Sequence, residues 1–260
     1  DLFKTLEFRV LVKKMGLEAA PSVTEKAPEV TSTNLQMGLF STVAVQESKP
    51  AAVISKDRSF IVVDDEEKFK QFIDKLAGEK RLAFFYSGTG FAVSSVKDDF
   101  YLPLGHTPLF HKNLDLNKIK EFFRNSDSKF ITYNFKPLLN EGVEIKNMDM
   151  DLMIAYHLIS SQTKGVEIPL EQLSGIDIAP YSEKFGKEAP GNLSTEEYGK
   201  FLTERSKGIM ETYGIAMEEI KGKDLFEVLE KTEMPLIKVL SAMERKGIKI
   251  DPVYFAKYEK

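Results

Sequence analysis

The sequence contains no cysteine and no tryptophan. Without cysteine the chain cannot form a disulfide bond, a thiolate metal site or a cysteine nucleophile. A cysteine-free chain fits a reducing compartment, where disulfides are rare, so we expect a cytoplasmic protein.

Long apolar stretches are also missing. No run approaches the roughly 18 apolar residues needed to cross a bilayer, so we expect no membrane partner. The opening residues "DLFKTLEFRVLVKKMG" are amphipathic and lack the apolar core of a signal peptide. The chain starts without methionine and stops within "YFAKYEK", which indicates a piece of a longer protein.

Basic residues are not in excess. The 36 Lys and Arg residues are outnumbered by 40 Asp and Glu residues, and the net charge is −4. Non-specific DNA binding depends mainly on neutralising phosphate charges, so we expect weak DNA affinity from this chain by itself. We also expect the chain to be a monomer.

The motifs of several large enzyme classes are absent: there is no P-loop, no dinucleotide-binding fingerprint and no G-x-S-x-G nucleophile motif. Gly88 and Gly90 flank Thr89 after a strand pattern, but a second strand pattern follows instead of a helix. A hairpin turn is therefore favoured over a phosphate-binding loop. The histidines have no partner at metal-binding spacing, which predicts structural or solvated roles; they are His106, His111 and His157.

Acidic residues occur in three close pairs: Asp64 with Asp65, Asp98 with Asp99, and Asp149 with Asp151. Two-metal chemistry requires carboxylates that converge on two ions about 4 Å apart. Each pair has a simpler structural interpretation. We expect the first pair to supply a helix cap through Asp64, the second to lie in a turn between strands, and the third to open a helix.

The periodic patterns predict an α/β fold. The expected strands are 59–65, 82–86, 91–96, 100–104, 129–134 and 142–145. The expected helices are 1–15, 65–78, 115–125, 134–140, 151–161, 169–175, 194–220 and 232–247, with a loop over 178–192. The expected caps are Asp115, Ser194 (with Glu197 three residues on, as in a capping box) and Thr232, each for the helix that it opens. Strands that first form hairpins and then alternate with helices indicate a mixed sheet covered by helices.

Three stretches resemble the family A DNA polymerases, the family of bacterial DNA polymerase I. "EMPLIKVLSAMERKGIKIDPVYF" (233–255) is similar to the segment that joins the family's exonuclease and polymerase domains. "FIVVDDEEKFKQFIDKLAGEKRLAFFYSGTGF" (60–91) resembles the start of its 3′–5′ exonuclease domain. "DLFKTLEFRVLVKKM" (1–15) resembles the last helix of its 5′-nuclease.

The resemblance implies an RNase H-like 3′–5′ exonuclease fold and four regions. These are the end of a 5′-nuclease (1–16), a proline-containing linker (17–52), an exonuclease-like domain (53–231) and the start of a polymerase domain (232–260). The family's role in DNA replication and repair implies contact with DNA through the full-length polymerase. The 5′-nuclease and polymerase domains would be partners within one chain. Mg²⁺ is expected only in a polymerase site beyond Lys260, and no cofactor in this chain.

Active exonuclease domains of this family hold two metal ions with four carboxylates. The Asp-x-Glu pair at the end of the first strand falls here on Phe85 and Ser87. In the stretch that corresponds to Asn-x-x-x-Asp, Asn134 is kept and Leu138 stands at the position of the Asp. In the stretch that corresponds to Tyr-x-x-x-Asp, Tyr198 is kept and Leu202 stands at the position of the Asp. Magnesium requires hard oxygen ligands, so the resemblance implies an inactive site without metal.

Two interpretations of the sequence remain. The first is an inactive exonuclease-like domain that serves as a structural platform for the polymerase. The second is an active proofreading exonuclease with relocated ligands, for which Glu204 is the nearest acid to Leu202. Two residues along a helix rotate a side chain by about 200°, so Glu204 is expected to face away from the position of Leu202.

Overall fold

The protein is described here by a computed structural model that covers residues 59–107, 112–251 and 254. All of them belong to the compact unit Ser48–Lys260. The expected helix 1–16, the linker 17–52 and His111 lie outside the described residues. The domain boundaries expected from the sequence therefore stay predictions.

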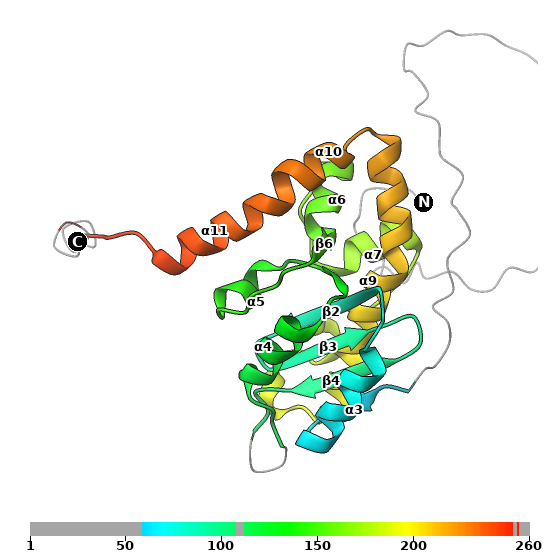
Figure 1. Cartoon of the computed structure of the whole chain (residues 1–260), viewed down its shortest axis with the longest axis vertical. Coiled ribbons are helices and arrows are strands. Elements are labelled where there is room, and N and C mark those ends of the chain that lie inside the picture. Colours follow the sequence, from blue (N-terminus) through cyan, green and yellow to red (C-terminus); the bar gives the residue numbers. More distant parts are fainter. Residues whose placement is uncertain (1–58, 108–111, 252–253, 255–260) are drawn as a thin grey trace, which may run out of the picture. The chain divides into compact units, whose positions relative to one another are not determined.

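Among the described elements a strand and a helix come first, then a meander of three strands, then alternating helices and strands, and finally helices alone (Figure 1). In chain order they are β1 (Ile61–Val62), α3 (Glu66–Leu76), β2 (Arg81–Ser87), β3 (Gly90–Ser94), β4 (Asp99–Pro103), α4 (Leu116–Asn125), β5 (Lys129–Thr132), α5 (Lys136–Asn140), β6 (Met148–Asp151), α6 (Leu152–Ser160), α7 (Glu167–Ser174), α8 (Tyr181–Lys184), the 3₁₀ turn η1 (Pro190–Asn192), α9 (Thr195–Gly222), α10 (Phe226–Val228), the π-helical turn η2 (Leu229–Glu233) and α11 (Met234–Lys246). Within the part of the chain that is described, no helix is both long and apolar enough to span a membrane.

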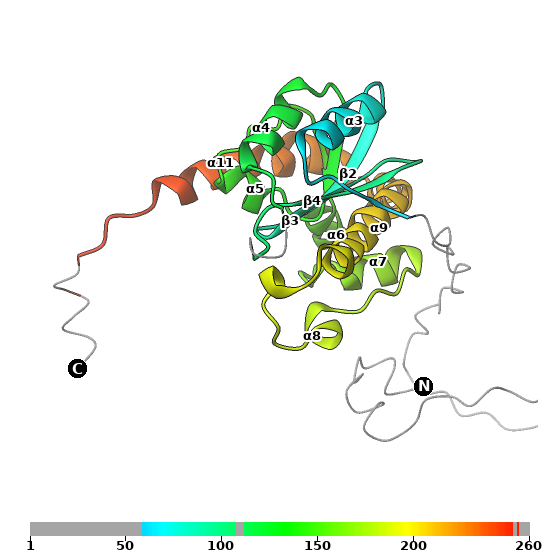
Figure 2. The ribbon, with the colours of Figure 1, turned by 90° about the horizontal axis from the view of Figure 1, so that it is seen from below.

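The strands of this unit form one mixed sheet in the order β1-β4-β3-β2-β5-β6. Strands β2, β3 and β4 are antiparallel neighbours, whereas β1 pairs with β4, and β5 with β2 and β6, in parallel. Figure 2 shows α3 and α4 over one face of the sheet and α6, α7 and α9 over the other. The mixed sheet flanked by helices confirms the fold class expected from the sequence.

The two faces of β2 enter two different apolar clusters, because successive side chains of a strand point to opposite sides. Phe84 is fully buried beneath α3 and α4, where its ring contacts those of Phe91, Phe123, Phe130 and Phe135. On the other side, α9 contacts β2, β3 and β4. Burial on both faces explains why β3 and β4 read as almost continuous apolar runs.

Helix α9 begins at the predicted capping box. The Ser194 hydroxyl accepts a hydrogen bond from the backbone N–H of Glu197 at 3.1 Å and donates one to its carboxylate at 2.8 Å. These bonds satisfy a donor that the first turn of a helix otherwise leaves unpaired. The helix then runs for 28 residues and crosses the sheet, with contacts to β1, β4, β3, β2 and β5.

Several local predictions were wrong. Asp65, not Asp64, caps α3 by accepting from Lys68 N at 2.8 Å, while Asp64 bonds the Lys68 ammonium at 2.6 Å. Thr232 caps nothing, because α10, η2 and α11 continue without a break through it. The expected loop 178–192 contains α8 and η1.

The expected strand 142–145 is also absent from the described residues, and β6 forms instead at Met148–Asp151. Its position is set by parallel pairing with β5, across an irregular register between Phe130 and Ile131. Asp149 therefore lies in a strand, and only Asp151 opens helix α6. Asp99 is likewise the first residue of β4, not part of the turn before it.

Candidate functional site

The candidate site lies where β2 ends. Ser87 pairs with Gly90, so Gly88 and Thr89 form a two-residue hairpin turn, as predicted. Such a turn brings the next strand back directly and leaves no helix N-terminus to bind phosphate. The strand end presents Phe85 and Ser87, both half-buried, to α9.

A hydrogen bond joins Ser87 to α9. The Ser87 Oγ and Tyr198 Oη atoms are 2.7 Å apart, although 111 residues separate them in the sequence. Burial raises the pKa of the Tyr198 hydroxyl, against a smaller lowering by the bond from Ser87. The phenol therefore stays neutral near pH 7. Both partners are uncharged, so the contact holds β2 to α9 without bringing a formal charge to the strand end.

Behind Tyr198, a histidine has a fixed tautomer. His106 Nδ1 lies 2.9 Å from the carbonyl oxygen of Leu193, and Nε2 lies 2.5 Å from the Tyr101 hydroxyl. A carbonyl can only accept, so Nδ1 carries the proton and Nε2 accepts from Tyr101. His106 is 2% exposed. This confirms the structural role expected for it, and the exposed His157, which contacts Thr163, fits a solvated role.

Leu202 lies one helical turn after Tyr198 and is fully buried. Its cluster consists of Ala92, Tyr101, Leu193, Tyr198, Phe201 and Leu202, with Phe85 packed against it. The structure thus brings together Phe85, Ser87, Tyr198 and Leu202. An apolar side chain with no exposed surface fills the place that the family resemblance assigns to a carboxylate.

Leu138 lies on α5, which contacts β2. It is also fully buried, but it belongs to the other apolar cluster of the sheet and not to the cluster around Leu202. Phe85 packs against both clusters. The retained Asn134 adopts the left-handed conformation with φ of 75°, and its side-chain oxygen accepts from Lys136 N at 3.1 Å. Asparagine tolerates this conformation better than most residues, which gives it a structural role in the turn before α5.

Asp151 holds that turn in place, a role that the sequence did not reveal. Its carboxylate accepts from the backbone N–H groups of Asn134 at 3.0 Å and Phe135 at 2.8 Å, and from Met153 and Ile154 at the start of α6. Burial raises the pKa of Asp151 to about 6, against the lowering by these four bonds. The local sequence around Asp151 indicated only a helix cap. Its bonds to Asn134 and Phe135, 17 and 16 residues earlier, depend on the parallel pairing of β5 with β6, which the local sequence does not show.

Arg205 fixes the outer side of α9 and was also missed. It is 2% exposed and donates to the carbonyls of Phe201 and Ala179 and to Glu167 Oε1, the last at 2.6 Å. Its guanidinium lies 3.3 Å from the centre of the Phe201 ring. All of its contacts are structural, and they tie α9 to α7 and to the segment before α8. A charged residue inside a helix gives no sequence signal of such burial.

Glu204 was the candidate for a relocated ligand. It lies at hydrogen-bond distance from Lys184, with Nζ and Oε2 3.4 Å apart, and keeps 34% of its side-chain surface exposed. It is not part of the cluster around Leu202. Within residues 59–107, 112–251 and 254, no three His, Cys, Asp or Glu side chains gather closely enough to hold a metal ion. The described side chains at the end of β2 therefore offer no carboxylate set for two-metal chemistry.

The chain is similar to DNA polymerase I along nearly its whole length. It is 21% identical over 257 residues to the enzyme of Bacillus subtilis, a match that spans 96% of this chain and 26% of the relative. It is 24% identical over 294 residues to that of Chloroflexus aurantiacus, spanning 97% of this chain and 30% of the relative. The chain thus corresponds to less than a third of these proteins. No protein-family model matches it.

Solved structures show the same fold at low identity. Escherichia coli RNase D, an exoribonuclease, superposes with a TM-score of 0.56 at 12% identity, over 74% of this chain and 52% of that one. The catalytic core of RRP6 from Trypanosoma brucei, in its mutant C496S form, superposes with a TM-score of 0.52 at 13% identity, over 70% of this chain and 52% of that one. The resemblance and the RNase H-like exonuclease fold expected from the sequence are both confirmed.

Proposed function

We propose that this chain is a catalytically inactive 3′–5′ exonuclease-like domain that serves as a structural platform within a DNA polymerase I. The proposal rests mainly on the end of β2, where buried or neutral side chains occupy all four positions that the family resemblance assigns to metal ligands. Leu138 and Leu202 have no exposed surface, and Ser87 is bonded to Tyr198. Hydrolysis by two metal ions requires carboxylates at these places to hold the ions and activate water.

Exonuclease activity is the direct test. A 5′-labelled single-stranded oligonucleotide incubated with the chain and Mg²⁺ or Mn²⁺ should keep its full length. The matched control is Glu204→Gln, which removes the nearest acid to Leu202. Shortening from the 3′ end that disappears in this variant would overturn the proposal and establish relocated ligands. Shortening that persists equally in the variant and in a mock preparation would come from a contaminant.

DNA affinity should be weak. The net charge is −4, and phosphate neutralisation provides most non-specific affinity. In this proposal DNA is reached through the rest of the polymerase. Fluorescence anisotropy with single- and double-stranded oligonucleotides at physiological salt should give a Kd no tighter than about 1 µM, which is the tight-binding limit of the usual non-specific range of about 10⁻⁴–10⁻⁶ M. A Kd well below this value would show a DNA site of the chain's own.

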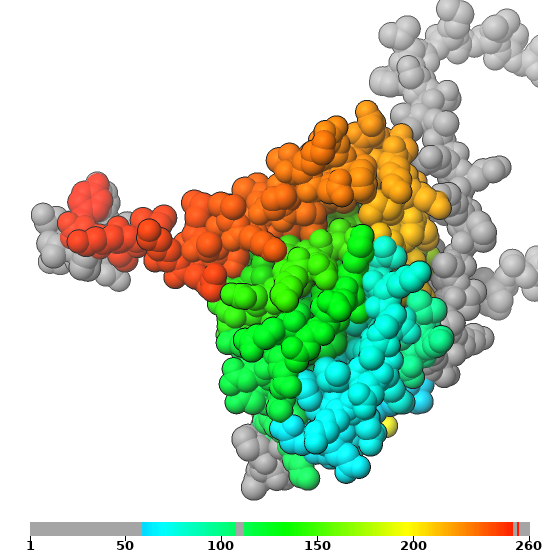
Figure 3. All heavy atoms as spheres, viewed as in Figure 1, coloured from blue at the N-terminus to red at the C-terminus, as the bar shows by residue number. Residues whose placement is uncertain are grey.

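The platform role is supported by the surface of α11 (Figure 3). One side of this helix lies on α5, where the Ser241 hydroxyl donates to Asn140 at 2.7 Å and Glu244 bonds both Lys136 and Asn140. The other side carries an exposed apolar stripe at helical spacing: Leu236, Val239, Leu240 and Met243, 38–62% exposed. Contiguous exposed apolar side chains mark an interaction surface. We assign this stripe to the polymerase portion of the relatives, which are more than three times as long as the matched region.

Polar substitutions should affect the exposed and the buried side of α11 differently. Replacing the four stripe residues by Gln should change the stability of this chain by no more than about 0.5 kcal/mol per site, because they are already exposed. Ile237→Gln, at a position 2% exposed, should cost about 2–5 kcal/mol. In a longer protein that includes the polymerase portion, the stripe variant should also lower the Tm. An unchanged Tm there would contradict the platform role.

A further inference from the structure

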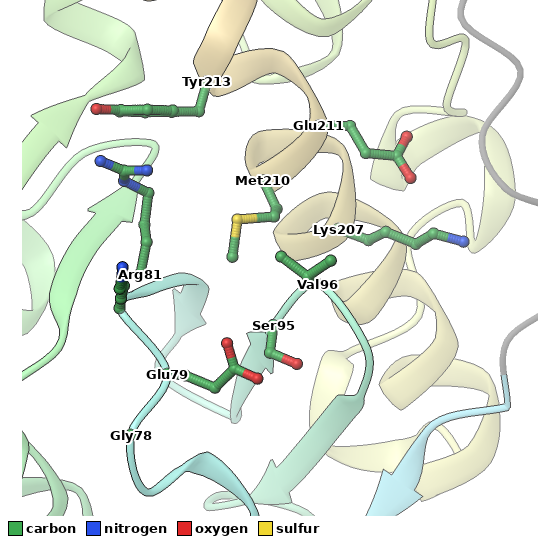
Figure 4. A pocket seen from close by; sticks show the side chains of 10 residues that line it. Gly78, Glu79, Arg81, Ser95, Val96, Lys207, Met210, Glu211 and Tyr213 are labelled. Atoms are coloured by element: carbon green, nitrogen blue, oxygen red, sulfur yellow. The ribbon is translucent and has the colours of Figure 1, made fainter.

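A cavity of about 620 Å³ lies at the opposite end of β2 from Ser87. It is bounded by the segment Gly78–Arg81 before and at the start of β2, by Ser95 and Val96 after β3, and by one side of α9 from Lys207 to Tyr213 (Figure 4). Arg81 and Ser87 are about 20 Å apart along the strand, so this cavity is separate from the candidate site. Its volume falls within the range of small-molecule sites.

Arg81 and Tyr213 form one wall of the cavity, and Arg81 is held in place. The Arg81 guanidinium carbon lies 3.9 Å from the centre of the Tyr213 ring, and Arg81 Nε donates to Asp149 at 2.7 Å. Burial, with the charge of Asp149 as a second cause, raises the pKa of Tyr213 to about 12. The phenol therefore remains protonated at neutral pH. The Arg81 side chain is thus held in place before any ligand arrives.

The remaining walls combine apolar groups with one carboxylate. In Figure 4 the Met210 side chain points into the space between Arg81 and Val96, and the Glu79 carboxylate is turned toward the same space. Val96 is 72% exposed. Glu79 is half-buried, and no group in the described part of the chain forms a hydrogen bond or ion pair with its carboxylate. Lys207 and Glu211 extend toward the far side of α9.

We propose that this cavity binds an uncharged, planar heteroaromatic ring bearing an amino group, such as adenine or cytosine. The ring would lie between the Met210 thioether and the Arg81 guanidinium, two groups that favour contact with π-systems. The amino group would donate to Glu79, which gives a charge-assisted hydrogen bond. Lys80 and Arg81 disfavour a cationic ligand, and Glu79 disfavours a phosphate. The inference does not depend on whether the end of β2 is inactive.

Isothermal titration with two matched nucleosides tests the proposal on the intact chain. Adenosine is expected to bind with a Kd on the order of 0.1 mM, given the usual free energy per ligand atom. Purine riboside, which lacks only the amino group, should bind about tenfold more weakly. In Glu79→Met, which keeps the side-chain length but removes the acceptor, the two ligands should bind equally. Glu211→Gln is the control, because its carboxylate points away from the cavity.

Three results would overturn the proposal. The first is no detectable binding at an adenosine concentration 10-fold above the expected Kd. The others are equal affinity of the parent chain for the two nucleosides, and an equal loss of adenosine affinity in Glu79→Met and Glu211→Gln. Circular dichroism of each variant verifies folding, and Met210→Ala provides a second perturbation of the same cavity. A competition experiment with a short oligo-dA identifies the source of the ring. Competition by the oligonucleotide would indicate a base of single-stranded DNA, and binding of adenosine alone would indicate a free nucleoside.

Discussion

The variant that restores all four acids, Phe85→Asp, Ser87→Glu, Leu138→Asp and Leu202→Asp, is expected to melt at a markedly lower temperature than the parent. Leu138 and Leu202 are fully buried, and burying a side chain of this size is worth about 1.5–3 kcal/mol. The replacements give up that contribution and place carboxylates among apolar groups, where each charge is costly without a partner. The summed loss is comparable with the whole stability of a typical domain, about 5–15 kcal/mol.

Added Mg²⁺ distinguishes the cost of the unpaired carboxylates from the cost of losing the buried apolar side chains. A ligand that binds only the folded state stabilises it, so Mg²⁺ should recover part of the Tm if the four acids converge. Leu138→Ala and Leu202→Ala serve as controls, because they create cavities without adding charge and should cost about 2–5 kcal/mol each without responding to Mg²⁺. A quadruple variant as stable as the parent in the absence of metal would show that these side chains do not fill the site. It would also put the assignment of the four positions in doubt.

The position of Phe85 explains why introducing the four carboxylates is expected to destabilise the domain. Its ring packs against the cluster that contains Leu138 and against the cluster that contains Leu202. The position that the family resemblance assigns to a metal ligand thus packs against both parts of the core. Two residues further along the strand, the bond between Ser87 and Tyr198 links the strand end to α9. A carboxylate at position 85 would have to face both apolar clusters.

Local patterns predicted the elements whose signals lie within a few residues. The Gly88-Thr89 turn, the Asp115 cap of α4 and the Ser194 capping box were predicted from short motifs, and the structure contains all three. The structure also brings Ser87 into contact with Tyr198, two residues that the resemblance assigned to separate ligand stretches. These successes share a feature: the residues that determine the local conformation are close in sequence, or a motif specifies them together.

The errors arose where distant residues determine the structure. Nothing within 142–151 indicates that the strand begins at Met148, because pairing with β5 selects that position. The burial of Arg205 depends on Glu167 and on the carbonyl of Ala179, 38 and 26 residues away. The cavity at Arg81 combines the start of β2 and the residues after β3 with the middle of α9, more than a hundred residues later in the chain. Sequence periodicity reports which face of an element is apolar, but not which polar groups from other elements will meet it.

Substituting Asp151 should destabilise the domain strongly. Its carboxylate accepts from four backbone N–H groups, two in the turn at Asn134 and Phe135 and two at the start of α6. In Asp151→Ala these donors lose their acceptor inside the protein, and leaving even one buried donor unsatisfied costs about 1–3 kcal/mol. We expect a total loss of about 3–5 kcal/mol in the free energy of unfolding. Asp151→Asn keeps one acceptor oxygen and should lose less. Urea unfolding measures both variants, and a loss below about 1 kcal/mol for Asp151→Ala would contradict this role.

The same carboxylate should also make stability depend on pH in a particular direction. Burial raises the pKa of Asp151 to about 6 in the folded protein, from a usual value of 3.8. The folded state therefore binds this proton more readily than the unfolded chain. The favourable contribution is complete below about pH 4 and is lost as the pH rises through about 6. Because Asn does not titrate, the stability of the parent minus that of Asp151→Asn should increase by about 2–3 kcal/mol between pH 7 and pH 4. Other groups titrate in both proteins and cancel in this difference. A difference that stays constant over this range would show that the four N–H donors hold the carboxylate ionised despite its burial, and a falling difference would show that they lower its pKa.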